Sequence, residues 1–110
     1  MDLKELTQEM NRFVSSKGWY EPNSPRPQTP KNLAISLSLE SAEVLEHFQW
    51  SEKTSNQEEL ESELADVTLY LLQLASVCTI DLESAVLKKL ALNYSRNWDQ
   101  DSSQSQANPV

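Results

Sequence analysis

Two short stretches of this sequence place acidic residues three positions apart. Glu40 and Glu43 occur in ESAEVLEHFQW, and Glu63 and Asp66 occur in ELADVTLY. Like charges at this spacing repel one another on a helix, at a cost of a few tenths of a kcal/mol per pair. Four carboxylates on two facing helices repel strongly unless they are protonated or bound to cations. The pattern therefore predicts a divalent-cation site, with solvated acids on helix surfaces as the alternative interpretation.

The ligand types in this cluster favour hard cations. An all-oxygen set suits Mg²⁺ or Mn²⁺ better than Zn²⁺ or iron. A di-iron bundle requires two Glu-x-x-His pairs, and the one histidine, His47, lies four residues after Glu43, so that alternative fails. We interpret His47 as a residue behind the ligands or at the surface. Mg²⁺ held by carboxylates leaves positions open for substrate phosphates, and paired ions can clamp the oxygens of a displacement at phosphorus.

The acids lie beside apolar stripes on both predicted helices, which is not the pattern of a simple solvated face. The predicted helix that contains Glu40 carries no basic residue after Lys31, and the predicted helix that contains Glu63 carries none, so no cation four residues away offsets the acids. On the helix that contains Glu63, the acidic stripe contains Glu59, Glu63, Asp66, Tyr70 and Gln73. A predicted core stripe beside it contains Leu64, Val67 and Leu71.

Two helices are predicted in the first half of the chain. Apolar residues at helical spacing begin at residue 3, and the helix ends near Lys17 because Gly18 is a typical residue just past a helix. A proline-rich loop over residues 21–30 follows. Thr29 and Pro30 then predict the start of a second helix, which runs to about Gln49.

Two further helices complete an all-α fold, most simply a four-helix bundle. Ser55 and Glu58 form a capping-box pattern that predicts a third helix ending at Cys78, and Asp81 caps a fourth that ends near Asn97. The lone Cys78 lies in an apolar run, so we expect a structural thiol in the core. Residues 1–98 are expected to form one helical domain and residues 99–110 a disordered polar tail.

Composition excludes several functions. The net charge of −8 argues against binding to nucleic acid, which needs a basic face. Gly18 is the one glycine, so no glycine-rich phosphate loop exists and phosphates would be held by metal ions and basic side chains. The sequence has no run of 18 apolar residues, so no membrane span is predicted. The N-terminus does not resemble a signal peptide. A cytoplasmic location without a membrane partner is expected.

Basic and aromatic residues supply candidate contacts to a substrate. Lys89, Asn93 and Arg96 share one face of the fourth helix, where they fit either phosphate binding or the helix dipole. Trp19 and Trp50 lie at helix ends next to loops. Each is suited either to covering the core or to stacking on a nucleobase.

With these residues in place, the sequence resembles the MazG-like all-α nucleoside triphosphate pyrophosphohydrolases, and within them the dCTP pyrophosphatase group. The resemblance extends from about Trp19 to Arg96. It is carried by TPKNLAISLSLESAEVLEHFQW, ELADVTLYLLQLA and DLESAVLKKLALNYSRN.

The resemblance implies a Mg²⁺-dependent hydrolase that cleaves a nucleoside triphosphate, preferably dCTP-like, to a monophosphate and pyrophosphate in house-cleaning of the nucleotide pool. It implies that the metal-binding, catalytic residues are Glu40, Glu43, Glu63 and Asp66. The implied substrate-binding residues are Trp19, Lys31, Asn32, Trp50, Tyr70, Lys89, Asn93 and Arg96. Members of the family associate into dimers and often tetramers, so a homotetramer is expected.

Two departures from the family pattern leave questions open. Many members have a second glutamate where this chain has Leu39, so Glu43, Glu46 or the metal ions remain candidates for activating water. The dCTP group commonly has histidine where this chain has Gln28, so the preferred base stays open. Two other functions are alternatives: a non-enzymatic helical interaction or regulatory module, and a dUTPase-type relative. The four retained ligand types favour the hydrolase, and the short chain and the FQW stretch disfavour the dUTPase type.

Overall fold

The computed structural model describes residues 1–96 of the 110-residue chain. They form four α-helices: α1 (Leu3–Ser16), α2 (Pro30–Glu46), α3 (Gln57–Val77) and α4 (Leu82–Ser95). No strand occurs between residues 1 and 96, which confirms the all-α prediction.

The chain divides into two compact units. The first, Met1–Ile80, contains α1, α2 and α3, and the second, Asp81–Val110, contains α4. The predicted single domain over residues 1–98 stays a prediction, and the predicted tail lies outside the described residues. None of the four described helices is by itself both long enough and apolar enough to cross a membrane.

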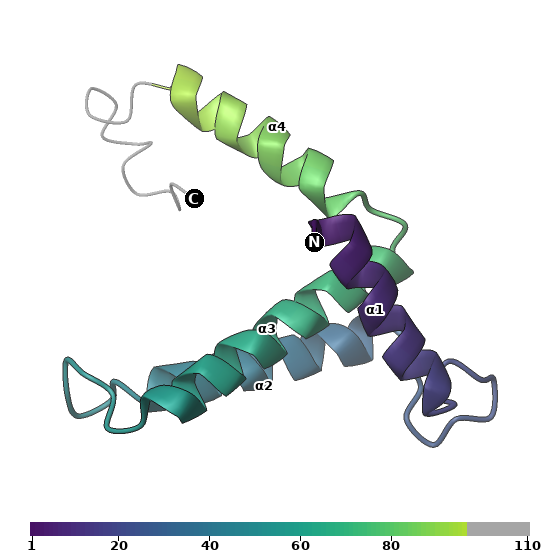
Figure 1. Ribbon diagram of the computed structural model, residues 1–110, viewed down its shortest axis with the longest axis horizontal. Coiled ribbons are helices and arrows are strands. Elements are labelled where there is room, and N and C mark those ends of the chain that lie inside the picture. Colours follow the sequence, from purple (N-terminus) through teal and green to yellow (C-terminus); the bar gives the residue numbers. More distant parts are fainter. Residues whose placement is uncertain (97–110) are drawn as a thin grey trace. The chain divides into compact units, whose positions relative to one another are not determined.

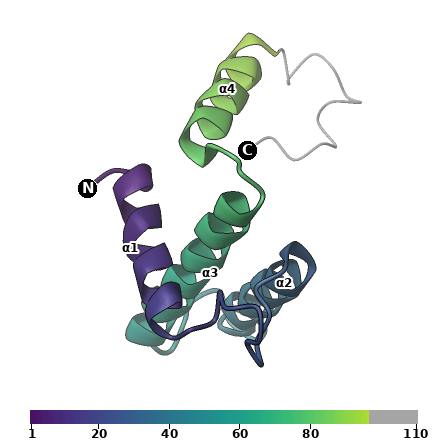
Figure 2. The ribbon, with the colours of Figure 1, turned by 90° about the vertical axis from the view of Figure 1, so that its right-hand side faces the viewer.

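Helices α2 and α3 pair along their length in the first unit, and α1 packs against α3 (Figure 1). The loop of residues 47–56 joins α2 to α3 at one end, so the two helices run antiparallel (Figures 1 and 2). This hairpin carries both acidic motifs. Residues that are 23 positions apart in sequence are thereby placed on adjacent helices.

Side-chain caps define the helix starts, as the sequence predicts. Thr29 Oγ1 accepts a hydrogen bond from the Asn32 N–H at 3.2 Å at the start of α2, with Pro30 in the first helical position. In the second unit, Asp81 Oδ1 accepts from the Ser84 N–H at 3.1 Å. Gly18, just past α1, has a φ of +72°, a conformation that glycine adopts without steric cost.

Two predicted boundaries at the 47–56 loop are wrong. Helix α2 ends at Glu46 rather than near Gln49, because the chain tightens there: the Phe48 N–H donates to the Leu45 carbonyl, three residues back, at 3.0 Å. The cap of α3 is Asn56, whose Oδ1 accepts from the Glu59 N–H at 3.1 Å, and not Ser55. The predicted end of α4 near Asn97 lies outside the described residues.

The buried core of the first unit is small and lies where α1, α2 and α3 meet. Its apolar members are Met10, Val14, Leu33, Leu72 and Ala75. The prediction that Leu64, Val67 and Leu71 form a buried core stripe is wrong for a single copy of the chain, because Leu64 and Leu71 are 48% and 41% exposed. Cys78 is also exposed rather than buried, because α3 has already ended at Val77 and the thiol lies in the turn beyond it.

Polar side chains attach the proline-rich loop to α1 and α3. The Tyr20 hydroxyl donates to Asn11 Oδ1 at 2.6 Å, and Gln73 Nε2 on α3 donates to Gln28 Oε1 at 2.6 Å. Burial raises the pKa of Tyr20, while a hydrogen bond with Gln73 lowers it by a smaller amount. The net rise moves the phenol further from ionisation, in keeping with its role as a donor to Asn11. The loop is therefore held against the α1 and α3 faces that frame the candidate site.

Candidate active site

The four predicted carboxylates gather on the helix pair. Burial of Glu40 on α2 raises its pKa, and the hydrogen bond and charge of Glu43 raise it further, followed by the charges of Asp66 and Glu63 on α3. Each of the other three acids is therefore near enough to act on Glu40. The antiparallel hairpin brings together the two motifs as the sequence analysis expected.

One oxygen of this cluster is buried without a partner. Glu40 Oε2 is shielded from solvent and has no hydrogen bond in the described structure. A buried, unsatisfied carboxylate oxygen is costly, whereas a bound cation would satisfy it. All four side chains offer oxygen, the ligand atom that Mg²⁺ and Mn²⁺ prefer. The donor set therefore fits a hard divalent ion.

The four side chains do not yet converge on one point. Within residues 1–96, no group of three or more His, Cys, Asp or Glu side chains is already arranged to hold a metal ion. The acids share one region of the helix pair, so binding would require them to turn toward a shared ion. Such turning is a change of side-chain rotamer on helices that the hairpin already holds side by side.

His47 lies behind this cluster and contacts one of the acids. Its Nε2 is hydrogen-bonded to Glu63 Oε2, and its Nδ1 lies 2.6 Å from Thr54 Oγ1. The imidazole is mostly buried, with 10% of its side chain exposed against 23% for Glu63. This placement matches the interpretation of His47 as a residue behind the predicted ligands.

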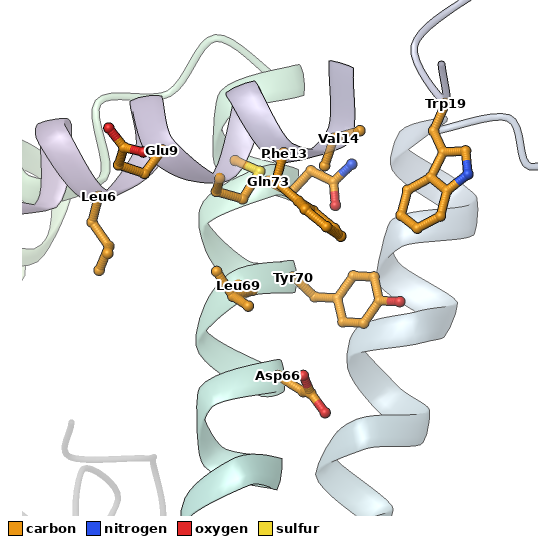
Figure 3. Close-up of a pocket in the computed structure, with 10 residues that line it drawn as sticks. Leu6, Glu9, Phe13, Val14, Trp19, Asp66, Leu69, Tyr70 and Gln73 are labelled. Atoms are coloured by element: carbon orange, nitrogen blue, oxygen red, sulfur yellow. The ribbon is translucent and has the colours of Figure 1, made fainter. Parts of the chain in front are cut away.

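An apolar cavity of about 430 Å³ lies between α1, α3 and Trp19 (Figure 3). Asp66 and Tyr70 extend into the space between α3 and α2, and the Trp19 ring lies above Tyr70 (Figure 3). The cavity is lined by Leu6, Glu9, Met10, Phe13, Val14, Trp19, Asp66, Leu69, Tyr70 and Gln73. Asp66 therefore belongs both to the carboxylate cluster and to an aromatic-lined cavity.

A second, more polar cavity of about 350 Å³ adjoins the first under the proline-rich loop. Trp19, Tyr70 and Gln73 line both cavities. The other lining residues of the second are Pro25, Arg26, Pro27, Gln28, Asn32, Leu33 and Ser36. Both volumes lie within the range of small-molecule sites, which is about 300–1,000 Å³.

Contacts on two sides hold the Trp19 ring at the boundary between these cavities. Phe13 meets it edge to face, with 5.8 Å between ring centroids and an interplanar angle of 87°. The Arg26 guanidinium lies over the ring, 5.6 Å from its centroid. A flat aromatic surface next to a cation and close to Asp66 can hold a ligand that has both a planar ring and an anionic part.

The other predicted substrate-binding residues line separate cavities, have other partners or belong to the second unit. Trp50 is 90% exposed and lines a separate cavity of about 410 Å³ in the 47–56 loop. Lys31 lines a shallow depression on α2 beside Leu39, and the Asn32 amide donates to the Pro27 carbonyl at 2.9 Å. Lys89, Asn93 and Arg96 belong to the second unit. Their predicted role stays a prediction.

Sequence reasoning missed Thr54, Arg26 and the Gln28–Gln73 pair. Thr54 and Arg26 stand in loops, where no helical periodicity links them to the acids. Gln73 was placed on the acidic stripe of α3, but its bond to Gln28 joins residues 45 positions apart. The one signal in the sequence that pointed to Gln28 was its position, where the dCTP pyrophosphatase group commonly has a histidine.

Comparisons with known proteins identify the family of the chain. The profile of the MazG-like family matches residues 35–107. dCTP pyrophosphatase 1 of Mus musculus is 33% identical over 104 residues, and that of Homo sapiens is 34% identical over 106 residues. Each alignment covers 86% of this chain but 56% of the relative, so the chain spans little more than half the length of these curated proteins.

A solved structure shares the fold. A pyrophosphatase from Archaeoglobus fulgidus DSM 4304 superposes with a TM-score of 0.66 and is 40% identical, covering 82% of this chain and 86% of that one. The profile match spans more than half of the 110 residues. These findings confirm the resemblance that the sequence motifs indicated: the chain belongs to the MazG-like family.

Proposed function

We propose that this chain is a Mg²⁺-dependent nucleoside triphosphate pyrophosphohydrolase that cleaves between the α- and β-phosphates and favours dCTP-like substrates. The observation that carries the proposal is the unpartnered, buried Glu40 Oε2 in a cluster of four acids. One of these acids, Asp66, also lines an aromatic cavity. The relatives named dCTP pyrophosphatase 1 and the neighbouring pyrophosphatase structure support the same activity.

The acids have a defined role in this proposal. Glu40, Glu43, Glu63 and Asp66 would hold Mg²⁺, which when bound neutralises the charge of the triphosphate. Without it, four carboxylates would repel a polyanionic substrate. Glu43 and Glu46, both exposed on α2, are the side-chain candidates for accepting a proton from the attacking water, and activation of the water by the metal ions is the alternative.

The aromatic residues would hold the base. A nucleobase between Trp19 and Tyr70 would gain stacking energy, which is about 1–3 kcal/mol per base. Gln28 and Gln73 offer amide groups beside these rings, and an amide presents both a donor and an acceptor. The amino and ring-nitrogen edge of cytosine requires that combination, which supports a dCTP-like substrate.

We also propose that the chain assembles into a homotetramer. Helix α2 exposes Leu39 and Leu45 by 63% and 69%, and α3 exposes Leu64 and Leu71. Apolar surface of this kind on both helices of the hairpin would be covered by copies of the chain. Light scattering coupled to gel filtration measures the mass, and a monomer in solution would contradict this part of the proposal.

The activity is tested by ³¹P NMR of dCTP incubated with the protein, with Mg²⁺ and with a chelator. The proposal predicts equal amounts of dCMP and pyrophosphate, formed only with Mg²⁺. Release of orthophosphate would contradict the proposed site of cleavage. No turnover of any triphosphate would contradict the activity and favour the non-enzymatic alternative. Running dATP, dUTP and a modified dCTP in parallel measures the base preference and tests the dUTPase-type alternative.

A further inference from the structure

His47 connects two parts of the site that lie on different segments. Its imidazole follows α2 directly, as the residue that caps it, and bonds Glu63 on α3 with one nitrogen and Thr54 in the loop with the other. The ring therefore spans the closed end of the hairpin. We refer to these three residues as the Thr54–His47–Glu63 triad.

The hydrogen bonds of Thr54 decide which nitrogen of His47 carries the proton. The Thr54 hydroxyl has one hydrogen to donate, and its oxygen already accepts from the Asn56 N–H at 3.2 Å. Two acceptors lie within reach of that hydrogen: His47 Nδ1 at 2.6 Å and the Asn56 carbonyl at 3.3 Å. The shorter contact is the stronger, so the hydroxyl donates to Nδ1.

The proton of the neutral imidazole then lies on Nε2. The Nε2–H donates to Glu63 Oε2, which is an acceptor when the carboxylate is ionised. Every bond in the triad thus has one donor and one acceptor. Because the imidazole is only 10% exposed, solvent competes weakly for these bonds.

The triad fixes one oxygen of Glu63 and leaves the other for a ligand. A carboxylate accepts at both oxygens, so a bond at Oε2 sets the orientation of the group without occupying Oε1. Thr54 is itself anchored by the N–H of Asn56, the residue that caps α3. The carboxylate of Glu63 is therefore connected by hydrogen bonds, through His47 and Thr54, to the residue that begins its own helix.

We propose that Thr54 and His47 are positioning residues that orient Glu63 for binding a divalent cation. This inference rests on the proposed function, because it requires Glu63 to be a metal ligand. Residues that bond to metal ligands from behind typically contribute roughly 10- to 100-fold in metal affinity. Within the triad it is His47 that bonds Glu63. Thr54 acts one bond further from the ion, through His47, so loss of its hydroxyl is expected to weaken metal binding about 10-fold, at the lower end of that range.

The hydrogen-bond pattern is tested first in the metal-free protein. His47 is the one histidine of the sequence, so ¹⁵N-histidine labelling of the untagged full chain gives a single imidazole spectrum. At mildly alkaline pH, long-range ¹H–¹⁵N spectra should show a protonated Nε2 and an unprotonated Nδ1. A proton on Nδ1 instead would overturn the proposal, because Nε2 could not then donate to an ionised Glu63.

Variants of Thr54 test the effect on the metal site. Mn²⁺ binding, followed by electron paramagnetic resonance, should weaken about 10-fold in Thr54→Val and return to near the parent value in Thr54→Ser, which keeps the hydroxyl. Thr7→Val is the matched control, because Thr7 also donates its hydroxyl to a partner, the Leu3 carbonyl at 2.7 Å, but on α1. It should bind Mn²⁺ like the parent.

The outcomes separate this inference from the proposed function. Circular dichroism should show the same helix content in all Thr54 variants. If the parent binds Mn²⁺ and Glu63→Gln loses it, but Thr54→Val binds as tightly as the parent, the positioning role is wrong while the metal site stands. If Glu63→Gln binds Mn²⁺ like the parent, the assignment of Glu63 as a ligand is wrong, and the proposed site is contradicted directly.

Discussion

The carboxyl groups of Glu40 on α2 and Asp66 on α3 lie close enough across the helix pair for their charges to interact. Asp66 is one of three acids that act on Glu40, after burial and Glu43 and before Glu63. An arrangement that raises the pKa of a partly buried glutamate costs stability whenever all the acids are ionised. A bound cation would offset this repulsion among the carboxylates, so the stability of the protein should depend both on these acids and on Mg²⁺.

Replacing Glu40 should stabilise the metal-free protein at neutral pH. Because its pKa is raised from 4.5, the folded chain binds this proton more tightly than the unfolded chain does. The resulting stabilisation is present at low pH and is lost as the pH rises through the raised pKa. Glu40→Gln removes that loss, so its advantage over the parent in free energy of unfolding should grow above pH 4.5.

Urea unfolding of both proteins in chelator, repeated across the acidic and neutral range, measures this difference. Glu61→Gln, at an exposed position of the same helix as Asp66, serves as the control for loss of one negative charge. If the gain in free energy of unfolding from Glu40→Gln is constant with pH, or equal to the gain from Glu61→Gln, then burial and the other acids do not raise the pKa of Glu40.

Added Mg²⁺ should stabilise the parent protein more than a variant that lacks one of the four carboxylates. A ligand that binds only the folded state stabilises it by about 2.7 kcal/mol at 100 times its dissociation constant. The parent should therefore gain stability with Mg²⁺ concentration, whereas Asp66→Asn, which lacks one carboxylate, should gain little. Thermal unfolding across a Mg²⁺ series is the measurement, with K⁺ at matched ionic strength as the control. Equal responses of the two proteins would argue against Asp66 as a ligand.

Loss of a single carboxylate should nearly abolish turnover. Because even residues that bond to a ligand from behind are worth roughly 10- to 100-fold, we expect Glu40→Gln and Asp66→Asn to lower kcat/KM by more than about 100-fold. The helices should remain intact, because both positions lie on helices whose caps and core are unchanged. The dCTP assay with pyrophosphate detection measures this, and activity retained in both variants would refute the site.

Tyr70 should contribute to substrate binding through its ring. Tyr70→Leu removes the stacking surface beside Trp19 and should raise KM by roughly 5- to 150-fold, the equivalent of about 1–3 kcal/mol. Tyr70→Phe keeps the ring and should stay near the parent value. If the leucine variant keeps the parent KM, or if the phenylalanine variant is equally impaired, stacking is not the role of this residue.

Local signals in the sequence predicted most of the helical framework. Thr29, Pro30 and Asp81 act within one turn of their helices, so their caps can be read without knowledge of the fold. Asn56 was missed because a neighbouring capping box competed with it, and a boundary that depends on one residue is the least certain part of such a prediction. Cys78 was assigned to the core because its apolar neighbours continue past the end of α3.

The candidate site was predictable only where one helix carries its parts. The spacing of Glu40 and Glu43, and of Glu63 and Asp66, places each pair on one face, and the hairpin brings the pairs together. The Thr54–His47–Glu63 triad depends on how the 47–56 loop folds back, which no periodicity encodes. The Gln28–Gln73 bond likewise depends on where the proline-rich loop packs.

The central claim is that two helices share a divalent cation through four carboxylates. Its most direct test is an anomalous difference map from crystals of the full chain grown with Mn²⁺. The account predicts a peak between α2 and α3, bounded by oxygens of Glu40, Glu43, Glu63 and Asp66. A map with no peak there, in which these side chains point apart into solvent, would contradict it.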